Sequence, residues 1–349
     1  QHNDARRQRQ MCIRDSTHIL TMSFEMPQFN RTRRIWIYLP QDYHNTTDHY
    51  PVLYMHDGQN VFDVAFSFAG EWGVDEAMIS MENAGEQPAI IVGIDNGEAE
   101  RTNEYTPWTH PTYGGGDGDA YIDFIVQTLK PAIDSAFRTL PDREITAIMG
   151  SSLGGLISFY GAIREQSVFS KAGIFSSSFW FSESAYTFPQ TVGKQADMRM
   201  YFLAGELEST TMVSDMEAMY DTLLSIGFGS GEMKTVSKPD GTHSEWFWER
   251  EFPDAYRWLF AMDTTTAIGA GYQTSEPFMY YTDGLIYFNE IFDNDSARLI
   301  LYDLLGRPLF NIGISDVGRT ELPPLPDGIY IALVENETSR FVQKIVIGK

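Results

Sequence analysis

The segment 150–155, Gly-Ser-Ser-Leu-Gly-Gly, constrains the fold of this chain more than any other stretch. The apolar run 144–149 before it is typical of a buried parallel strand, and apolar residues recur at helical spacing from Leu156 to Ile163. A serine on a turn between a strand and a helix needs flanking glycines, because the two backbones pass close to each other. The pattern therefore predicts that Ser152 is a nucleophile on a sharp turn. An ordinary small-residue turn before a helix is the alternative.

Strand-like and helix-like segments alternate along residues 18–262. The expected strands cover 19–24, 34–39, 51–56, 89–94, 144–149, 171–175, 198–203 and 235–238, the first two of them antiparallel. Helical spacing marks 72–81, 119–137, 156–163 and 213–224. Pro131 lies inside the second of these helices and predicts a kink or two abutting helices. The alternation predicts an α/β fold, with a mostly parallel sheet covered by helices on both faces.

The two ends of the chain differ from this central domain of residues 18–262. Residues 1–17 are polar and Arg-rich, and the stretch 8–16 resembles translated adaptor sequence from broken ends of metagenomic assemblies. We therefore expect residues 1–17 to be non-native or disordered, and a natural signal peptide to have been lost by truncation. A small-residue linker is expected at 263–272. From 273 to 349, short β-rich runs between turn residues predict an all-β sandwich of roughly seven strands.

Composition excludes several classes of function. The chain of 349 residues has 43% hydrophobic residues, enough for a large core, and a net charge of −23. That charge argues against nucleic acid or an anionic membrane surface as a partner. The single cysteine excludes an intrachain disulfide and a cysteine-based metal site, and we expect neither a metal nor a cofactor. There is no apolar run of roughly 18 residues, the length that a membrane-spanning helix requires.

A serine nucleophile needs a base that takes its proton, and histidine is the usual choice. In the strand–turn–helix hydrolases the histidine follows the serine in the chain. His243 alone among the seven histidines follows Ser152, so we expect it to be the base. A surface histidine in a loop is the alternative.

The third catalytic residue should be a carboxylate near the end of the strand 199–203, where it can orient the imidazole. The sequence offers Glu206 and Glu208 there, and we favour Glu208. Asp215 and Asp240 are further alternatives in this acidic chain.

An anionic reaction intermediate needs two backbone amide donors, one of them the amide after the nucleophile, Leu153. We expect the second from Gln59, where Gly58 allows close backbone approach; a tight turn is the alternative. Tryptophans near predicted strand ends are candidates for a substrate pocket, although each could equally be a core residue: Trp72, Trp108, Trp180 and Trp246. The glycine-rich segment 114–118 lacks the Lys-Ser/Thr of a phosphate loop, so a flexible rim and a helix start are expected.

Four motifs carry a family resemblance. They are 50–60 (Tyr-Pro-Val-Leu-Tyr-Met-His-Asp-Gly-Gln-Asn), 93–97 (Gly-Ile-Asp-Asn-Gly), 150–155, and 243–246 (His-Ser-Glu-Trp). Together they resemble the Putative esterase family of α/β-hydrolases, which includes esterase D, ferric enterobactin esterases and feruloyl esterases. The resemblance implies an α/β-hydrolase fold and cofactor-free hydrolysis of carboxylic esters by Ser152, His243 and an acid at Glu208. The acid in this family is often aspartate, so a glutamate departs from the pattern.

The C-terminal region carries a second resemblance. Residues 300–308, 325–332 and 344–347 resemble the sorting domain of the type IX secretion system of Bacteroidetes. This resemblance implies the secretion machinery as a partner, possible removal of residues 273–349, and a role outside the cell or at its surface.

The sequence thus predicts a secreted serine carboxylesterase, acting on acyl or feruloyl esters of polysaccharides or related esters. An acyltransferase, or a polyester or siderophore esterase, would use the same three residues. A catalytically silent surface binding module is the alternative of another class, and it predicts a broken site.

Overall fold

The computed structural model describes residues 12–13, 18–67, 69–260, 279–282, 285–288, 298–302, 307–313, 319–322, 325–326, 328–335 and 340–347. The chain separates into two compact units, Gln1–Ala261 and Met262–Lys349, each of which is described by itself. The linker expected at 263–272 lies outside the described residues, as do 1–11 and 14–17. The domain bounds drawn from the sequence therefore stay a prediction.

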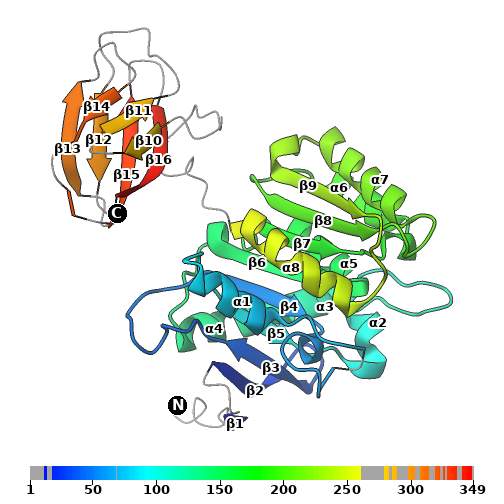
Figure 1. Cartoon of the computed structure of the whole chain (residues 1–349). Coiled ribbons are helices and arrows are strands. Elements are labelled where there is room, and N and C mark those ends of the chain that lie inside the picture. The colour runs from blue at the N-terminus through cyan, green and yellow to red at the C-terminus, as the bar shows by residue number, and fades with distance from the viewer. Residues whose placement is uncertain are drawn as a thin grey trace. The chain divides into compact units, whose positions relative to one another are not determined.

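The first unit contains a nine-stranded sheet in the order β1-β2-β3-β5-β4-β6-β7-β8-β9 (Figure 1). Its strands are β1 (Cys12–Ile13), β2 (Ile19–Met26), β3 (Arg31–Tyr38), β4 (Val52–His56), β5 (Ile90–Ile94), β6 (Thr146–Ser151), β7 (Lys171–Phe175), β8 (Arg199–Gly205) and β9 (Met233–Lys238). β1, β2 and β3 pair antiparallel, and β3 pairs antiparallel with β5. From β5 to β9 all neighbours are parallel. The sheet is therefore mostly parallel.

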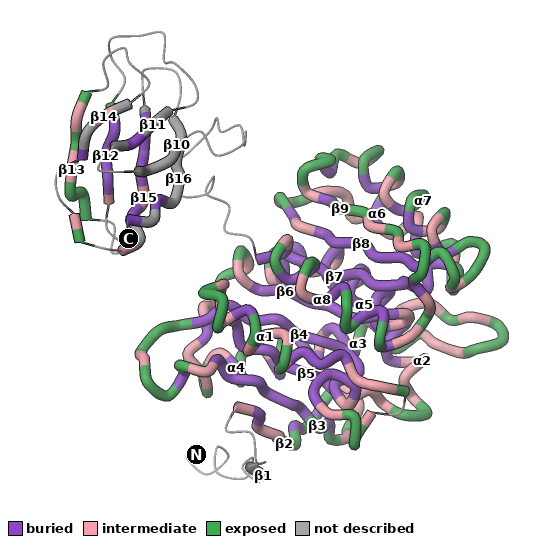
Figure 2. The backbone as a smooth tube through the Cα atoms, viewed as in Figure 1, coloured by how far each residue is buried: buried purple, intermediate pink, exposed green. Residues whose placement is uncertain are grey.

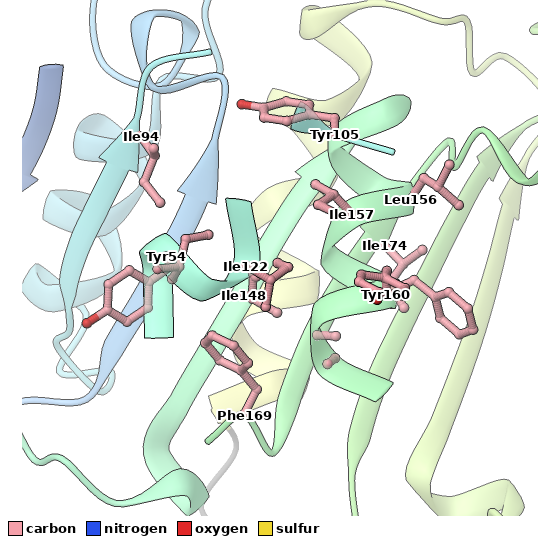
Figure 3. Close-up of a cluster of buried hydrophobic side chains, with 14 of the residues drawn as sticks. Tyr54, Ile94, Tyr105, Ile122, Ile148, Leu156, Ile157, Tyr160, Phe169 and Ile174 are labelled. Atoms are coloured by element: carbon pink, nitrogen blue, oxygen red, sulfur yellow. The ribbon is translucent and has the colours of Figure 1, made fainter. Parts of the chain in front are cut away.

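Helices cover both faces of this sheet. They are α1 (Val74–Asn83), α2 (Arg101–Glu104), α3 (Gly118–Asp123), α4 (Lys130–Ala136), α5 (Leu153–Arg164), α6 (Ser184–Val192), α7 (Met212–Ser225) and α8 (Glu245–Phe260). Successive strand residues point to opposite faces, so Leu53 and Met149 pack with α1 and α8, whereas Tyr54 and Ile148 pack with α3 to α7. The strands β4, β5, β6 and β7 are buried along their whole length, whereas the outer strands β2, β3 and β9 are partly exposed (Figure 2). Figure 3 shows the core on the face of the sheet that carries Tyr54 and Ile148, where Ile148 and Ile174 pack with Ile157 and Tyr160 of α5.

Two predicted elements differ in detail from the structure. The helix expected at 119–137 is a continuous helical stretch, in which a π-helical segment, η3 (Phe124–Leu129), lies between α3 and α4. Pro131 lies in the first turn of α4, directly after the π segment. The helix expected from residue 72 begins at Val74, because Gly73 has a left-handed backbone with φ 52°.

The described part of the second unit contains seven strands in two antiparallel sheets, β10-β11-β14 and β13-β12-β15-β16. Their bounds are β10 (Met279–Thr282), β11 (Leu285–Phe288), β12 (Arg298–Tyr302), β13 (Pro308–Gly313), β14 (Arg319–Glu321), β15 (Gly328–Glu335) and β16 (Arg340–Ile347). Leu299, Leu301, Ala332 and Val334 are fully buried and form its core with their neighbours. The predicted fold class, an α/β unit followed by a small β unit, is confirmed. Within the residues described, no helix has the length and apolar character needed to cross a bilayer.

Candidate active site

The loops that follow the parallel strands gather at one edge of the sheet, because the strands all point the same way. Four predicted site residues lie in or beside these loops: Gln59 after β4, Ser152 after β6, Glu208 after β8 and His243 after β9. The paired order β4-β6-β7-β8-β9 brings these loops side by side. Residues as far apart in the sequence as Gln59 and His243 therefore meet in one region.

Ser152 lies on the sharp turn that the glycine pattern predicts. Its backbone has φ 59° and ψ −123°, a strained conformation for a residue with a side chain. A Cβ on Gly150 would lie 2.8 Å from the backbone of Gly154, and one on Gly155 would lie 2.7 Å from the carbonyl of Phe175. The Ser152 amide donates to that same carbonyl at 2.9 Å. The glycines are needed because β6, β7 and α5 converge here.

The hydroxyl of Ser152 faces the loop after β7. Its Oγ lies 3.4 Å from Oγ of Ser178, whose amide donates to the Ser152 carbonyl at 3.1 Å. Within the described residues, Ser152 and His243 form no direct hydrogen bond. Catalytic hydrogen bonds are often long without substrate, so this geometry is compatible with proton transfer in a substrate complex.

Glu208 and His243 form a close pair. His243 Nδ1 lies 2.6 Å from Oε2 of Glu208, whose side chain is fully buried while that of His243 is 39% exposed. The other carboxylate oxygen, Oε1, accepts hydrogen bonds from the Gly205 amide at 2.6 Å and from Ser176 Oγ at 2.7 Å. Trp248 packs edge-on against the imidazole, with ring centroids 5.2 Å apart. The carboxylate is thus fixed, and it orients the imidazole.

The other carboxylates considered from the sequence occupy different places. Glu206 is exposed. Asp240 is paired with Arg250 on the surface, with oxygen–nitrogen distances of 2.5 and 3.0 Å. Asp215 lies on α7. Among these four carboxylates only Glu208 makes a hydrogen bond to His243 in the described structure.

Two backbone amides beside the nucleophile have no acceptor among the described residues: those of Leu153 and Gln59. Leu153 is the first residue of α5, where amides have no partner inside the helix. Gln59 lies in the short turn η1 (Gly58–Asn60) after β4. A Cβ on Gly58 would lie 2.6 Å from the backbone of Gly93, so only glycine allows this turn to pack on β5.

Asp57 fixes the shape of the turn that carries Gln59. Its backbone is left-handed, with φ 54° and ψ 48°. Its carboxylate binds Arg101 at 2.7 and 2.9 Å and Asn96 at 2.7 Å, and its amide donates to the Tyr105 hydroxyl at 2.9 Å. Burial alone would raise the pKa of Asp57, but the Arg101 guanidinium holds it below its usual value. Neither Arg101 nor Asn96 is predicted as a site residue from the sequence; Asn96 stands in the 93–97 motif, whereas no local pattern marks Arg101.

His56, the residue before Asp57, is buried beneath this turn. Its Nδ1 lies 3.0 Å from the Tyr121 hydroxyl, and Nε2 has no partner among the described residues. Burial lowers the pKa of His56 to about 3, so the ring is neutral at physiological pH. This second histidine is therefore a neutral, buried side chain that is hydrogen-bonded to Tyr121 of α3.

The four tryptophans considered for a substrate pocket have different surroundings. Trp180 and Trp246 are 54% and 46% exposed. Trp108 is half-buried and lies edge-on to Tyr160. Trp72 packs in the core, stacked on Phe175 with ring centroids 5.3 Å apart. The contact of the other three with substrate stays a prediction.

The glycine-rich segment builds a packed turn beside Trp180. His110 and Gly114 exchange backbone hydrogen bonds at 2.7 and 3.0 Å. The next residue, Gly115, has φ 104°, and a Cβ there would lie 2.5 Å from the carbonyl of Trp108. The turn presents Tyr113 to Trp180, with centroids 5.8 Å apart and planes at 81°. The predicted helix start is confirmed, since α3 begins at Gly118. In the part of the chain that the structure describes, no cluster of histidine, cysteine and acidic residues could hold a metal ion.

Residues 26–259 match the model of the family described as Putative esterase. The chain belongs to this family. Uncharacterized protein YbbA of Bacillus subtilis (strain 168) is 24% identical over 247 residues, which cover 67% of this chain and 95% of YbbA.

Solved structures share the fold of this Putative esterase member. An IroE-like serine hydrolase from Shewanella oneidensis aligns with a TM-score of 0.55 at 24% identity, covering 68% of this chain and 79% of that one. A ferulic acid esterase aligns with a TM-score of 0.52 at 17% identity, covering 68% of this chain and 98% of that one. These similarities show an α/β-hydrolase fold for the first unit.

Proposed function

We propose that this member of the Putative esterase family is a serine carboxylesterase that works through an acyl-enzyme on Ser152. The observation that carries the proposal is the 2.6 Å pair of Glu208 and His243 beside a strained serine. The amides of Leu153 and Gln59, which have no acceptor among the described residues, supply the donors that an anionic intermediate needs.

The mechanism follows from these groups. His243 Nε2 takes the proton of Ser152 as Oγ attacks the ester carbonyl carbon, and the Leu153 and Gln59 amides donate to the resulting oxyanion. The intermediate collapses, the ester C–O bond breaks, and the imidazolium returns the proton to the departing alcohol. Water then attacks the acyl-enzyme in the same way and releases the acid. Glu208 holds the imidazole and stabilises its cationic form.

The surroundings of the nucleophile favour an ester with a ring. Trp180 follows Ser178 by two residues, and Ser178 Oγ lies 3.4 Å from the nucleophile, so Trp180 borders the reaction site. Trp180 and Tyr113 form a corner of two nearly perpendicular rings. A planar ring can stack on one wall and present its edge to the other. This supports acyl or feruloyl esters of polysaccharides as the substrate class, in line with the likeness to a ferulic acid esterase.

Hydrolysis of p-nitrophenyl acetate and methyl ferulate tests the activity and the substrate class. We expect turnover of both by the wild type and none by Ser152→Ala. Trp180→Ala should lower kcat/KM for methyl ferulate about 10-fold more than for the acetate. Trp258→Ala is the control, because Trp258 lies near the C-terminal end of α8, and it should affect the two substrates equally. An inactive wild type that still binds ferulate esters would instead indicate a binding module. Equal losses on both substrates would refute the aromatic corner.

We also propose that residues 273–349 direct export to the cell surface or medium by a type IX machinery. The support is the resemblance of their motifs to such sorting domains, together with the separate, small β unit in which they lie. Fusion of this segment to a fluorescent carrier with a signal peptide, in a Bacteroidetes host, tests the proposal. Export that is equal with and without the segment, or equal in a strain lacking the machinery, would contradict it.

A further inference from the structure

Ser176, two residues before Ser178, lies between the candidate acid and a buried tryptophan. Its side chain has no exposed surface, and its backbone has φ 45°, a region that favours glycine. Trp248 Nε1 donates to Ser176 Oγ at 2.8 Å, and Ser176 Oγ donates to Glu208 Oε1 at 2.7 Å. The unfavourable backbone conformation has a cost, and the two hydrogen bonds of the side chain indicate that the hydroxyl has a specific role at this position.

The direction of each hydrogen bond follows from the chemistry of its donor. An indole N–H can only donate, so the Ser176 oxygen accepts from Trp248 and turns its own proton toward Glu208. The Gly205 amide donates to the same Oε1 at 2.6 Å. Oε1 thus accepts two hydrogen bonds, and Oε2, which as part of an ionised carboxylate can only accept, faces His243. The imidazole must then carry its proton on Nδ1, which leaves the Nε2 lone pair for the serine.

We propose that Trp248 and Ser176 are positioning residues that set the tautomer of His243 through the carboxylate of Glu208. This inference rests on the proposed esterase mechanism, since it assigns His243 as the base. Hydrogen bonds connect these four residues in series: Trp248 donates to Ser176, and Ser176 and His243 each donate to one oxygen of Glu208. Trp248 also packs on the imidazole, so it holds both ends of the chain.

A test must separate this role from simple packing. Ser177→Ala is a matched control for Ser176→Ala, because the neighbouring hydroxyl is also buried but has no partner among the described residues. Trp258→Phe is the control for Trp248→Phe. Trp258 lies ten residues further along the same helix, roughly 15 Å away, and packs on the same core.

Kinetics form the first measurement. We expect Ser176→Ala, which removes a hydrogen bond to the charged Glu208, to lower kcat roughly 10- to 100-fold. Trp248→Phe removes a hydrogen bond to the neutral Ser176 hydroxyl and should lower kcat roughly 3- to 10-fold, and both variants should keep KM within about twofold of wild type. The double variant should be no slower than the slower single variant, because both changes break one chain. The two controls should keep kcat within about twofold. Effects that multiply in the double variant, or losses equal to those of the controls, would overturn the proposal.

The second measurement does not depend on turnover. The ¹⁵N chemical shifts of His243, assigned by their loss in His243→Asn, report which imidazole nitrogen carries the proton. We expect an Nδ1–H tautomer in wild type and in both controls, and a mixed population in Ser176→Ala and Trp248→Phe. An unchanged tautomer in Ser176→Ala would refute the proposal that Ser176 sets the tautomer of His243. The result for Ser176→Ala is sufficient even if Trp248→Phe does not fold. Absence of esterase activity in wild type would refute the proposed function. The tautomer measurement would still test whether Trp248 and Ser176 position His243, because it does not depend on turnover.

Discussion

Replacement of Glu208 by glutamine changes a single atom at the centre of the candidate site. The position now occupied by Oε1 accepts from the Gly205 amide and from Ser176, so it must be taken by the oxygen of the new amide. The NH₂ group then faces His243 Nδ1 and forces that nitrogen to accept a hydrogen bond. The imidazole proton moves to Nε2, and His243 can no longer take the proton of Ser152.

The structure therefore predicts a large loss of activity with little loss of stability. A wrong histidine tautomer costs a serine hydrolase about 10⁴-fold in kcat, which corresponds to about 5.5 kcal/mol in the activation free energy. The glutamine keeps all three hydrogen bonds around the side chain, so the free energy of unfolding should change by less than about 1 kcal/mol.

Initial rates with p-nitrophenyl acetate and urea unfolding curves measure the two quantities. Glu206→Gln is the matched control, because Glu206 lies two residues away and is exposed. Its kcat should remain within about twofold of wild type. A Glu208→Gln enzyme that retains a tenth or more of wild-type kcat, or a Glu206→Gln enzyme that loses more, would show that the acid is assigned wrongly.

Other predictions concern the support of the site. Gly58→Ala should destabilise the fold by about 2 kcal/mol or more in urea unfolding, because its Cβ would lie 2.6 Å from the backbone of Gly93. Arg101→Met should lower kcat about 10-fold and leave KM nearly unchanged, because Asp57 then no longer holds the turn that carries the Gln59 amide; an unchanged kcat would separate this ion pair from catalysis. The pKa of His56 is depressed to about 3 in the folded protein, against about 6.5 when unfolded. Below pH 6.5 the unfolded chain binds a proton at His56 that the folded protein does not bind. Protonation of His56 therefore lowers the free energy of unfolding of wild type by about 2 kcal/mol at pH 5, and it has little effect above pH 6.5. His56→Gln should show a correspondingly flatter loss of stability from pH 6.5 to 5; parallel curves for the two proteins would contradict this.

Local patterns were sufficient to predict the fold class and the strained turn. The glycines around Ser152 can be read from the sequence because close passage of a strand and a helix excludes side chains at fixed positions. Alternation of strand and helix periodicity depends only on neighbouring residues, and it predicted the parallel sheet. The sequence also limited the base to one histidine, since His243 alone follows the serine.

The tertiary structure decided which carboxylate meets that histidine. Glu206 and Glu208 stand two residues apart on an irregular turn, and no periodicity says which side chain points inward. Glu208 does so because its carboxylate folds back onto the Gly205 amide. Trp72 likewise cannot be told from a pocket residue by sequence, yet it stacks on Phe175 in the core.

The residues that hold the site residues in place could not be predicted from the sequence either. Arg101 meets Asp57 across 44 positions, and Trp248 meets Ser176 across 72. Such contacts depend on which loops the strand order brings together, and a single chain carries no local signal of that order. The sequence by itself thus determined the nucleophile turn and the candidate base, whereas folding of the sheet selected the acid and the residues that hold it.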